Sequence, residues 1–371
     1  MPVRELPIFW KENAMNKKVL FFSSVEWSWM KQRPHFLAEE LAKAGCEVTY
    51  LAINPHGSCD EEIASRLRVC EITKVCGYMR TPLMRMLAKM KIAHCLRKQQ
   101  FDIVIVTNPV QLEMLPQRIV KPAKLIYDCM DLIAAFYQGR QKKLVEKLEK
   151  VLCEKADGIT VSSSTLKDFL IRHYAVPEEK CRLIYNALFP EDCEKAAKSP
   201  EIDGMKHPSM IYMGSIEQWL DLEVLSEFME KNPQWHLYMV GNVKAVLQEV
   251  LRKIPNCQLV GKLDHLEALE YVNSADITLL PFRVGGLVDM VDPVKLYEYI
   301  AMEKPIVSSY WPALEHFRGK GNIVFYQGKE DFSEKVHSLW LNKKITCYDP
   351  ERFVAENNWT KRANDLLEFI S

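Results

Sequence analysis

Short apolar runs rich in β-branched residues alternate with amphipathic stretches along the whole chain, and this alternation constrains the fold more than any other feature. Parallel strands covered on both faces give such continuous runs, and the covering helices give the amphipathic stretches. The runs form two series, at residues 19–24, 47–53, 102–107, 124–128, 158–163 and 182–186, and then at 209–215, 235–241, 257–262, 276–282, 304–310 and 322–326. We therefore predict two doubly wound α/β domains in tandem.

A segment with little periodic apolar content separates the two series. Residues 187–208 carry three prolines, one glycine and many charges, which is typical of a linker. We predict a first domain over residues 1–190, a linker over 191–207 and a second domain over 208–354. Residues 355–370 have an apolar stripe at helical spacing and an Asn-rich start, which predicts a C-terminal helix.

Composition excludes several classes of protein. The 49 basic and 49 acidic side chains cancel, so no overall charge attracts nucleic acid. The eleven cysteines show neither C-x-x-C nor a Cys/His metal spacing, and their irregular positions indicate reduced thiols. The N-terminal residues lack the apolar stretch of a signal peptide, and no apolar run reaches the ~18 residues of a membrane span. We expect a cytoplasmic protein.

The most informative motif is D-P-V-K-L-Y-E at residues 292–298, which follows a strand and a loop with two glycines. Asp292 and Pro293 are typical of an N-cap and a first helical position, so a helix should begin here. Its free amides and Lys295 would seat a diphosphate, and Glu298, on the same helix face, would suit ribose hydroxyls. The alternative is a capped core helix with Lys295 and Glu298 as a surface pair.

The loop after the first strand is rich in aromatic and polar residues. Arg33 lies at the start of a predicted helix, beside Trp27, Trp29, Gln32 and His35. Tryptophans stack on sugar rings, so an acceptor sugar or a donor phosphate would lie here. The alternative is that the tryptophans pack in the interior and that His35 is a hydrogen-bonded surface residue.

Three charged residues at predicted strand ends are further candidates. Asp128 and Asp131 follow one strand, and one of them would handle protons as a catalytic base, although Asp131 is also a candidate N-cap. Arg283 directly follows another strand, and its guanidinium suits phosphate oxygens, although it is also a candidate for a salt bridge. No D-x-D motif stands at a strand end, so we expect no metal.

Two segments at the opening of the two series, residues 21–45 and 211–225, carry a family resemblance together with D-P-V-K-L-Y-E-Y-I-A-M-E-K-P-I-V. With them nearly the whole chain resembles the family 4-like (group 1) GT-B glycosyltransferases, similar to those of teichuronic-acid and other cell-surface polysaccharide synthesis. The resemblance implies two Rossmann-like domains that face a central cleft, with the C-terminal residues 355–371 returning to the first domain.

The same resemblance assigns roles to single residues. It places Glu298 on the ribose and the turn from Val291 to Lys295, including Asp292 and Val294, on the diphosphate. Gly214 and Ser215 keep the tight turn that lets the backbone approach the donor.

The chain departs from the family in two places. Met290 stands where many members have a second glutamate, and the loop of residues 214–223 carries Glu217 and Asp221 where many have a basic residue. Positive charge for the leaving diphosphate must then come from Arg283 and Lys295.

Residues 79–100 carry six Lys or Arg and no acid, with Leu83, Met86, Leu87 and Met90 on one helical face. Such a segment can lie on anionic lipid, on the inner face of the cell membrane. The alternative is a covering helix with a solvated basic face.

The leading hypothesis is a retaining, metal-independent transferase without a cofactor. It would move a sugar from a nucleotide-diphosphate sugar to an acceptor hydroxyl in cell-surface polysaccharide or lipid-linked glycan synthesis. The alternatives are a nonhydrolysing nucleotide-sugar epimerase and a non-catalytic two-domain ligand-binding protein. A nicotinamide-dependent dehydrogenase is disfavoured because the chain has no G-x-G-x-x-G.

Overall fold

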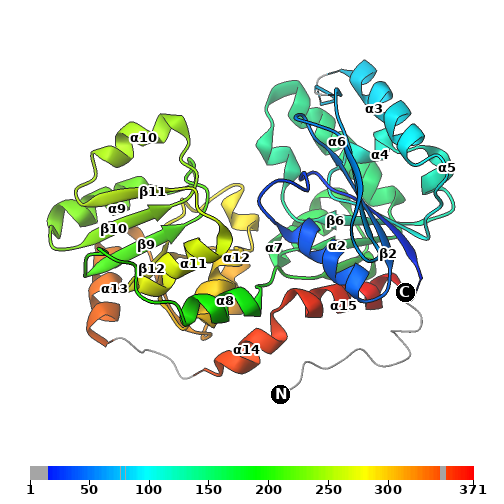
Figure 1. The fold of residues 1–371 in the computed structure, drawn as a ribbon. Helices are drawn as coiled ribbons and strands as arrows, with labels where there is room; N and C mark the ends of the chain where they lie inside the picture. Colours follow the sequence, from blue (N-terminus) through cyan, green and yellow to red (C-terminus); the bar gives the residue numbers. More distant parts are fainter. Residues whose placement is uncertain (1–15, 76, 80, 343–347) are drawn as a thin grey trace. The chain divides into compact units, whose positions relative to one another are not determined.

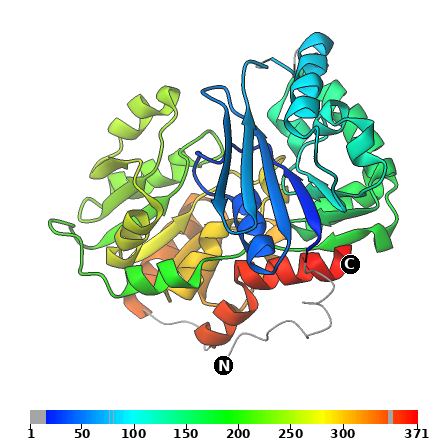
Figure 2. The same cartoon turned by 45° about the vertical axis from the view of Figure 1, so that its right-hand side comes forward.

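The computed structural model of the chain describes residues 16–75, 77–79, 81–342 and 348–371. The chain divides into two compact units, Met1–Asn186 with Trp359–Ser371, and Ala187–Asn358. In each unit a sheet is covered by helices (Figures 1 and 2). This confirms the predicted class of two Rossmann-like α/β domains.

The first unit contains an eight-stranded sheet in the order β3-β4-β2-β1-β5-β6-β7-β8. The strands are β1 (Lys18–Phe22), β2 (Glu47–Ile53), β3 (Cys59–Ala64), β4 (Leu67–Ile72), β5 (Ile103–Val106), β6 (Lys124–Cys129), β7 (Gly158–Val161) and β8 (Cys181–Leu183). All pairs are parallel except β3 with β4. Its helices are α2 (Arg33–Lys43), α3 (Pro82–Cys95), α4 (Gln111–Met114), α5 (Gln117–Val120), α6 (Gly139–Lys155), α7 (Ser164–Tyr174) and α15 (Trp359–Ile370).

The second unit contains a parallel six-stranded sheet in the order β11-β10-β9-β12-β13-β14. The strands are β9 (Ser209–Met213), β10 (His236–Val240), β11 (Cys257–Gly261), β12 (Ile277–Leu280), β13 (Pro305–Ser309) and β14 (Asn322–Tyr326). Numbered from β9, this is the Rossmann order 3-2-1-4-5-6. Its helices are α8 (Pro190–Ala197), α9 (Leu222–Lys231), α10 (Ala245–Arg252), α11 (His265–Ser274), α12 (Val294–Ala301), α13 (Gly328–Asn342) and α14 (Pro350–Glu356).

Both series of predicted strands are present, and the structure adds a β3–β4 hairpin that is not predicted from the sequence. β3 has the sequence C-D-E-E-I-A and is largely exposed at the edge of the sheet. A solvated edge strand needs no apolar run, so the pattern that revealed the buried strands could not reveal this one.

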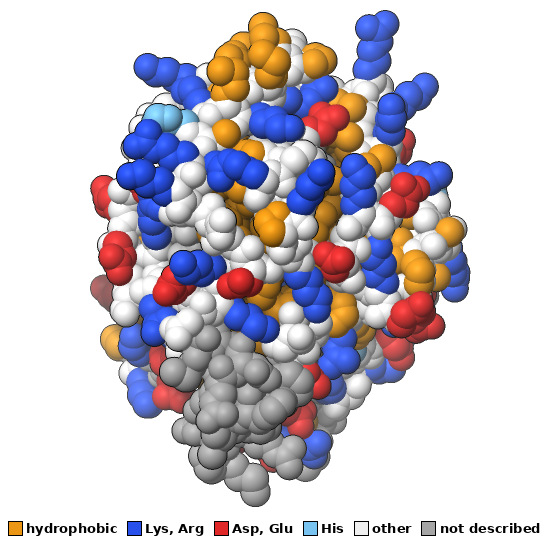
Figure 3. Space-filling view, turned by 90° about the vertical axis from the view of Figure 1, so that its right-hand side faces the viewer, with side chains coloured by type: hydrophobic (Ala, Val, Ile, Leu, Met, Phe, Trp, Pro, Cys, Tyr) orange, Lys and Arg blue, Asp and Glu red, His pale blue; other side chains and the backbone are white. Residues whose placement is uncertain are grey.

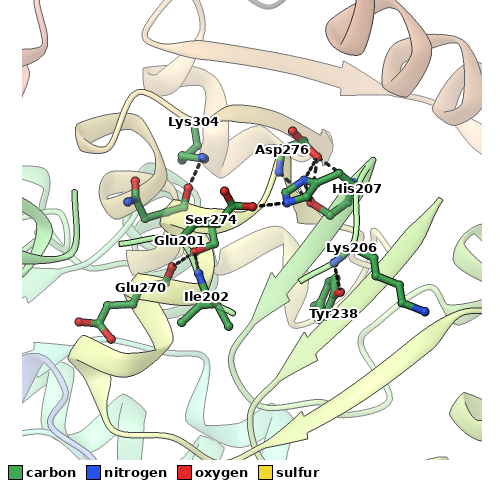
Figure 4. Close-up of polar contacts among 11 residues, drawn as sticks. Glu201, Ile202, Lys206, His207, Tyr238, Glu270, Ser274, Asp276 and Lys304 are labelled. Atoms are coloured by element: carbon green, nitrogen blue, oxygen red, sulfur yellow. Dashed lines mark hydrogen bonds and ion pairs between the residues drawn. The ribbon is translucent and has the colours of Figure 1, made fainter. Parts of the chain in front are cut away.

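The predicted linker belongs structurally to the second unit. It contains α8, which packs on α11. Beyond α8, His207 donates through Nδ1 to Oδ2 of Asp276 and through Nε2 to Oε1 of Glu201, each at 2.6 Å (Figure 4). The amide of Lys206 donates to the hydroxyl of Tyr238 at 2.8 Å. Side-chain hydrogen bonds hold this segment on the second unit, and they leave no apolar periodicity in the sequence.

The predicted C-terminal helix is α15, which begins at Trp359 rather than at residue 355, and it returns to the first unit as expected. The separate helix α14 precedes it and ends at Glu356. α15 lies beside α2 in both views (Figures 1 and 2). The ring centroids of Trp359 and Phe36 are 4.9 Å apart, and the hydroxyl of Thr360 donates to the carboxylate of Glu40 at 2.7 Å.

The expectation of reduced cysteines is wrong for one pair. Cys70 of β4 and Cys95 at the end of α3 form a disulfide, because α3 packs against β4 and brings together residues that are 25 apart in sequence. Other described cysteines are free thiols. Cys76, Cys347 and the first 15 residues, on which the expectation of no signal peptide depends, lie outside the described residues.

Candidate active site

The strand order of the second unit locates its ligand crevice. The order reverses between β9 and β12, and open α/β sheets bind ligands outside the carboxyl ends of the strands at such a point. Gly214 and Ser215 follow β9 directly, and Phe282 and Arg283 follow β12. Three of the predicted site residues, Gly214, Ser215 and Arg283, therefore lie at this switch point.

The helix expected at this edge begins one residue later than predicted. Pro293 is the N-cap of α12 and Val294 is its first residue. Asp292 does not cap the helix, which corrects the sequence prediction. Its buried carboxylate instead accepts the hydroxyl of Tyr297 at 3.0 and 3.1 Å and lies 3.4 Å from Nε2 of His316. The carboxylate of Asp292 can be buried because Tyr297 and His316 supply it with polar contacts.

Lys295 lies over the switch point. Its Nζ is 5.5 Å from the ring centroid of Tyr212 and 5.9 Å from that of Phe282. Within the described residues it has no hydrogen bond or ion pair. Burial lowers the pKa of this amine, an effect that the charge of Glu298 opposes. The ammonium group is therefore a cation held between two aromatic rings, with its hydrogen-bonding capacity unused.

Gly214 makes the position of Lys295 possible. Its φ is +130°, and a β-carbon there would lie 2.5 Å from Nζ of Lys295 and closer still to Cε. The structure therefore brings together these two predicted residues. Only glycine at this turn allows both the backbone conformation and the approach of the lysine.

Glu298, one turn into α12, is 4% exposed. Its Oε1 is 2.8 Å from Nε2 of His265, and Nδ1 of the same ring is 3.0 Å from Oδ2 of Asp192. Oε2 of Glu298 has no hydrogen-bond partner within the described part of the chain. The carboxylate is thus fixed by one oxygen and open at the other.

Arg283 is exposed and loosely held. Its side chain is 52% exposed, and Nη2 lies 3.6 Å from Glu223. Its amide donates to the carbonyl of Trp219 at 2.7 Å, which fixes the backbone and leaves the side chain free to reorient.

Ser215 is half-buried, and its carbonyl accepts the hydroxyl of Tyr212 at 3.0 Å.

In the first unit Arg33 is a buried ion-pair partner. Its Nε and Nη2 donate to Asp128, and Nη1 donates to the carbonyl of Ile184 at 2.8 Å. Asp128 also accepts the hydroxyl of Thr160 at 2.7 Å. This geometry ties α2 to β6 and the chain after β8, which fits a positioning role for Arg33.

His35 is fully buried. Its Nδ1 accepts the amide of Gln32 at 3.1 Å, and Nε2 donates to the carbonyl of Glu26 at 2.9 Å. The ring stacks on Tyr50, and burial lowers its pKa. Both nitrogens are occupied in the neutral ring, so this arrangement fits packing. Trp27 packs against the same tyrosine, whereas Trp29 is exposed.

Asp131, two residues after β6, differs from Asp128. Burial raises the pKa of its carboxyl to about 7; nearby Arg33 opposes this rise and Asp128 adds to it. Its side chain has no hydrogen-bond partner among the described residues. A carboxyl group that titrates near neutrality and has unused oxygens can accept a hydrogen bond or a proton.

Several residues at the carboxyl edges of the two sheets are not evident as site residues from the sequence. In the second unit these are His265 and the aromatic seat of Lys295, Tyr212 and Phe282. In the first unit the strand order reverses between β1 and β5, where the amide of Ser24 donates to Thr107 at 2.8 Å. The capping-box motif Asp264-x-x-Glu267 marks a helix start at the sheet edge and was the available signal for His265. No group of three or more metal-ligating side chains is found in the described ranges.

Comparisons with known proteins agree with this architecture. The family model described as Glycosyltransferase Family 4 matches residues 34–191, and the model Glycosyl transferases group 1 matches residues 207–342. TuaH of Bacillus subtilis (strain 168), named as a teichuronic acid biosynthesis glycosyltransferase, is 28% identical over 266 residues. That alignment covers 66% of this chain and 66% of TuaH.

Solved structures show the same fold at low sequence identity. The apo lipopolysaccharide outer core galactosyltransferase WaaB has a TM-score of 0.65 at 12% identity and covers 95% of this chain and 99% of its own. Anabaena Alr3699/HepE, solved with UDP and glucose, has a TM-score of 0.60 at 11% identity and covers 96% and 95%. The two family models together span both units, and the chain belongs to the GT-B glycosyltransferases with a family 4 domain and a group 1 domain.

Proposed function

We propose that this chain transfers a sugar from a nucleotide-diphosphate sugar to an acceptor hydroxyl, with the donor bound by the second unit. One observation carries the proposal. At the switch point of that unit an uncommitted ammonium group, Lys295, and a carboxylate with one open oxygen, Glu298, lie one turn apart on α12. The ammonium group can pair with a diphosphate, and the open carboxylate oxygen can accept hydrogen bonds from ribose hydroxyls.

The phosphates are held by charge and by backbone. The start of α12 at Val294 supplies free amides and the positive end of a helix dipole. Lys295 adds a positive charge. The exposed Arg283, which follows β12, reorients toward the phosphates and adds a second positive charge. The turn at Gly214 brings the backbone close to Lys295, so the phosphates bind beside Gly214 and Ser215. Asp292 supports the turn before α12 through Tyr297.

The first unit binds the acceptor. Asp131 accepts a hydrogen bond from the acceptor hydroxyl, and its pKa near 7 keeps it partly ionised at neutral pH. Arg33 acts through Asp128 to hold the end of β6, and His35 fixes the loop that carries Trp27. These two residues position the site rather than touch the substrate.

We further propose that transfer retains the anomeric configuration and needs no metal ion. Family membership favours retention, in which the leaving phosphate takes the acceptor proton. Lys295, Arg283 and the helix amides supply the charge that a metal would otherwise supply. The anomeric configuration of the product, read by NMR, tests the first point. Undiminished turnover in excess EDTA tests the second.

The acceptor is a growing cell-surface polysaccharide or a lipid-linked glycan. The names of TuaH and WaaB place those proteins in such syntheses, and this supports the same class of acceptor here. An epimerase would convert the donor without an acceptor, and a binding protein would not turn over; the comparisons favour neither. Product analysis with the donor alone and with the acceptor added separates the three.

The exposed face of α3 contacts an anionic membrane surface. Leu83, Met86 and Met90 of α3 are each more than half exposed. In Figure 3 hydrophobic side chains gather at the top of the face shown, where α3 lies in Figure 1, with Lys and Arg side chains around them. Apolar groups flanked by cations match the chemistry of anionic lipid. Arg80 of this segment lies outside the described residues.

Co-sedimentation with vesicles of phosphatidylglycerol and phosphatidylcholine tests this contact. We expect binding that weakens with salt and with the Met86→Glu, Met90→Glu double variant. Val246→Glu on α10, which is also highly exposed, is the control and should bind normally. Absence of binding at low salt refutes the contact. No described helix combines the length and the hydropathy needed to cross a membrane.

The donor is identified by thermal-shift measurements with UDP, GDP, ADP and dTDP. A nucleotide that binds the folded protein raises its melting temperature by mass action. We expect one of them to stabilise selectively, with UDP the first to test because HepE is solved with UDP. The sugar is then found by turnover with the corresponding nucleotide sugars. A protein that no nucleotide stabilises contradicts the proposed function.

A further inference from the structure

His265 connects Glu298 to a second helix. It is the first residue of α11 and is fixed there by a reciprocal cap: the amide of Glu267 donates to Asp264 at 2.8 Å, and the amide of Asp264 donates to Glu267 at 3.2 Å. From this position the ring lies between Glu298 of α12 and Asp192 of α8, at 2.8 and 3.0 Å. Three helices therefore meet at one imidazole.

The contacts of His265 define its protonation state. Ionised carboxylates only accept hydrogen bonds, so a ring nitrogen that contacts one must carry a proton. Both nitrogens contact carboxylates, and the ring is therefore an imidazolium. Burial lowers the pKa of His265, but the hydrogen bonds to Glu298 and Asp192 outweigh it and raise the pKa to about 9.

The imidazolium has a direct effect on Glu298. A buried carboxylate without a hydrogen-bond partner is costly. The imidazolium next to Oε1 pairs with the carboxylate of Glu298 and fixes its rotamer. As a result Oε2 is the atom through which Glu298 can accept from a ligand.

We propose that His265 is a positioning residue for nucleotide recognition, which holds Oε1 of Glu298 so that Oε2 meets the ribose hydroxyls, while Asp192 holds the ring from the opposite side. The inference rests on the proposed function, because it takes Glu298 as the ribose ligand. It adds that ribose recognition depends on α8 and α11, two helices without donor contacts of their own in that proposal.

Other titratable groups around the ring behave differently from it. Cys193 of α8 has a pKa raised by burial, so it stays protonated. Asp264 and Glu267 on α11 are engaged in the cap. Lys295 of α12 has a lowered pKa and acts on phosphate. Uridine, which has no phosphate, therefore isolates the effect of His265 from that of Lys295.

Titration calorimetry of UDP and uridine between pH 7 and 10 tests the proposal. At pH 7.5 we expect His265→Gln to weaken UDP binding about tenfold to a hundredfold, the range for losing a charged hydrogen bond. Wild-type affinity for both ligands should fall as the pH rises through about 9. For uridine this fall should be smaller in His265→Gln, where only the ionisation of the uracil N3–H of the ligand itself remains.

Two further variants sharpen the test. Asp192→Asn removes one of the two carboxylates that stabilise the imidazolium, so the alkaline fall in uridine affinity should move to lower pH. His236→Gln, at the amino end of β10, should bind like wild type. Circular dichroism and thermal melting of each variant show that the fold is retained.

The outcomes separate this inference from the proposed function. If Glu298→Ala loses UDP and His265→Gln does not, the positioning role is overturned and the function stands. A His265→Gln variant that keeps the wild-type alkaline fall in uridine affinity also overturns it. If wild type binds none of the nucleotides, the proposed function itself fails.

Discussion

Arg33 and Asp128 form a buried ion pair with two points of contact, in which Nε lies 3.0 Å from Oδ2 and Nη2 lies 2.8 Å from Oδ1. The two side chains are 4% and 1% exposed. They join the first turn of α2 to the end of β6, directly beside the candidate acceptor residue Asp131. The acceptor edge is therefore held by a charge pair that water does not reach.

Removing one member of this pair should destabilise the first unit. Arg33→Leu leaves the charge of Asp128 buried without a cation, which costs about 3–5 kcal/mol of unfolding free energy. Urea denaturation followed by tryptophan fluorescence measures the loss. Arg283→Leu, at an exposed position, is the control and should change stability by less than about 0.5 kcal/mol. Equal stabilities of the two variants would show that the pair is not buried.

Asp131→Asn should separate activity from stability. The wild-type carboxyl has a pKa raised by burial from 3.8 to about 7, so ionisation opposes folding as the pH rises between these values. The amide variant should therefore be more stable than wild type at pH 8. Its kcat should fall at least tenfold with UDP affinity unchanged, and the wild-type rate should decline below about pH 7. An active variant, or one less stable than wild type at pH 8, contradicts this role.

His207 should make the stability of the second unit depend on pH. The hydrogen bond to Asp276 raises its pKa above the ordinary 6.5, opposed by burial and supported by Glu201. The stabilisation is therefore complete below about pH 6.5 and is lost as the pH rises through the folded-state pKa. Chemical denaturation at pH 6 and pH 8.5 should show this fall in wild type and a smaller one in His207→Gln. The same fall in both proteins would exclude His207 as its source.

The turn at Gly214 gives a steric test of the donor site. A β-carbon there meets the side chain of Lys295, so Gly214→Ala should displace the lysine and weaken UDP binding at least tenfold. Gly328→Ala is the control, because its φ is also positive, at +79°, but a β-carbon there has open space. Comparable loss in both variants would assign the effect to backbone strain instead.

Lys295 should act on phosphate only. Lys295→Met keeps an unbranched side chain over Tyr212 and Phe282 but removes the charge. Calorimetry should show UDP binding weakened about tenfold to a hundredfold and uridine binding unchanged. A loss that is equal for the two ligands would place the lysine elsewhere in the site.

The parts of the fold and site that could be predicted from sequence are those encoded over short distances. Buried strands such as β1 and β9 are visible in the sequence as apolar runs. The motif at residues 292–298 predicts the start of α12 to within one residue, because the N-cap is Pro293 rather than Asp292. The edge strand β3 has no such run. His265 contacts residues 73 and 33 positions away, so no local pattern could pair it with Asp192 and Glu298.

The same limit applies to the residues of the first unit. In the sequence Arg33 and His35 are polar residues at a helix start near a strand end, and this makes them candidate site residues. The sequence could not show that Arg33 donates to Asp128 and to the carbonyl of Ile184. Nor could it show that His35 donates to the carbonyl of Glu26. Burial and partner choice depend on tertiary contacts that appear only when β6 and the chain after β8 are in place.

The central claim is that the carboxyl edge of the second sheet binds a nucleoside diphosphate, with Glu298 on the ribose. Calorimetric titration of the selected diphosphate, UDP first, into wild type and Glu298→Ala tests it most directly. We expect saturable binding to wild type and none measurable to the variant, with both proteins folded by circular dichroism. Unchanged affinity in the variant would mean that the nucleotide is held elsewhere.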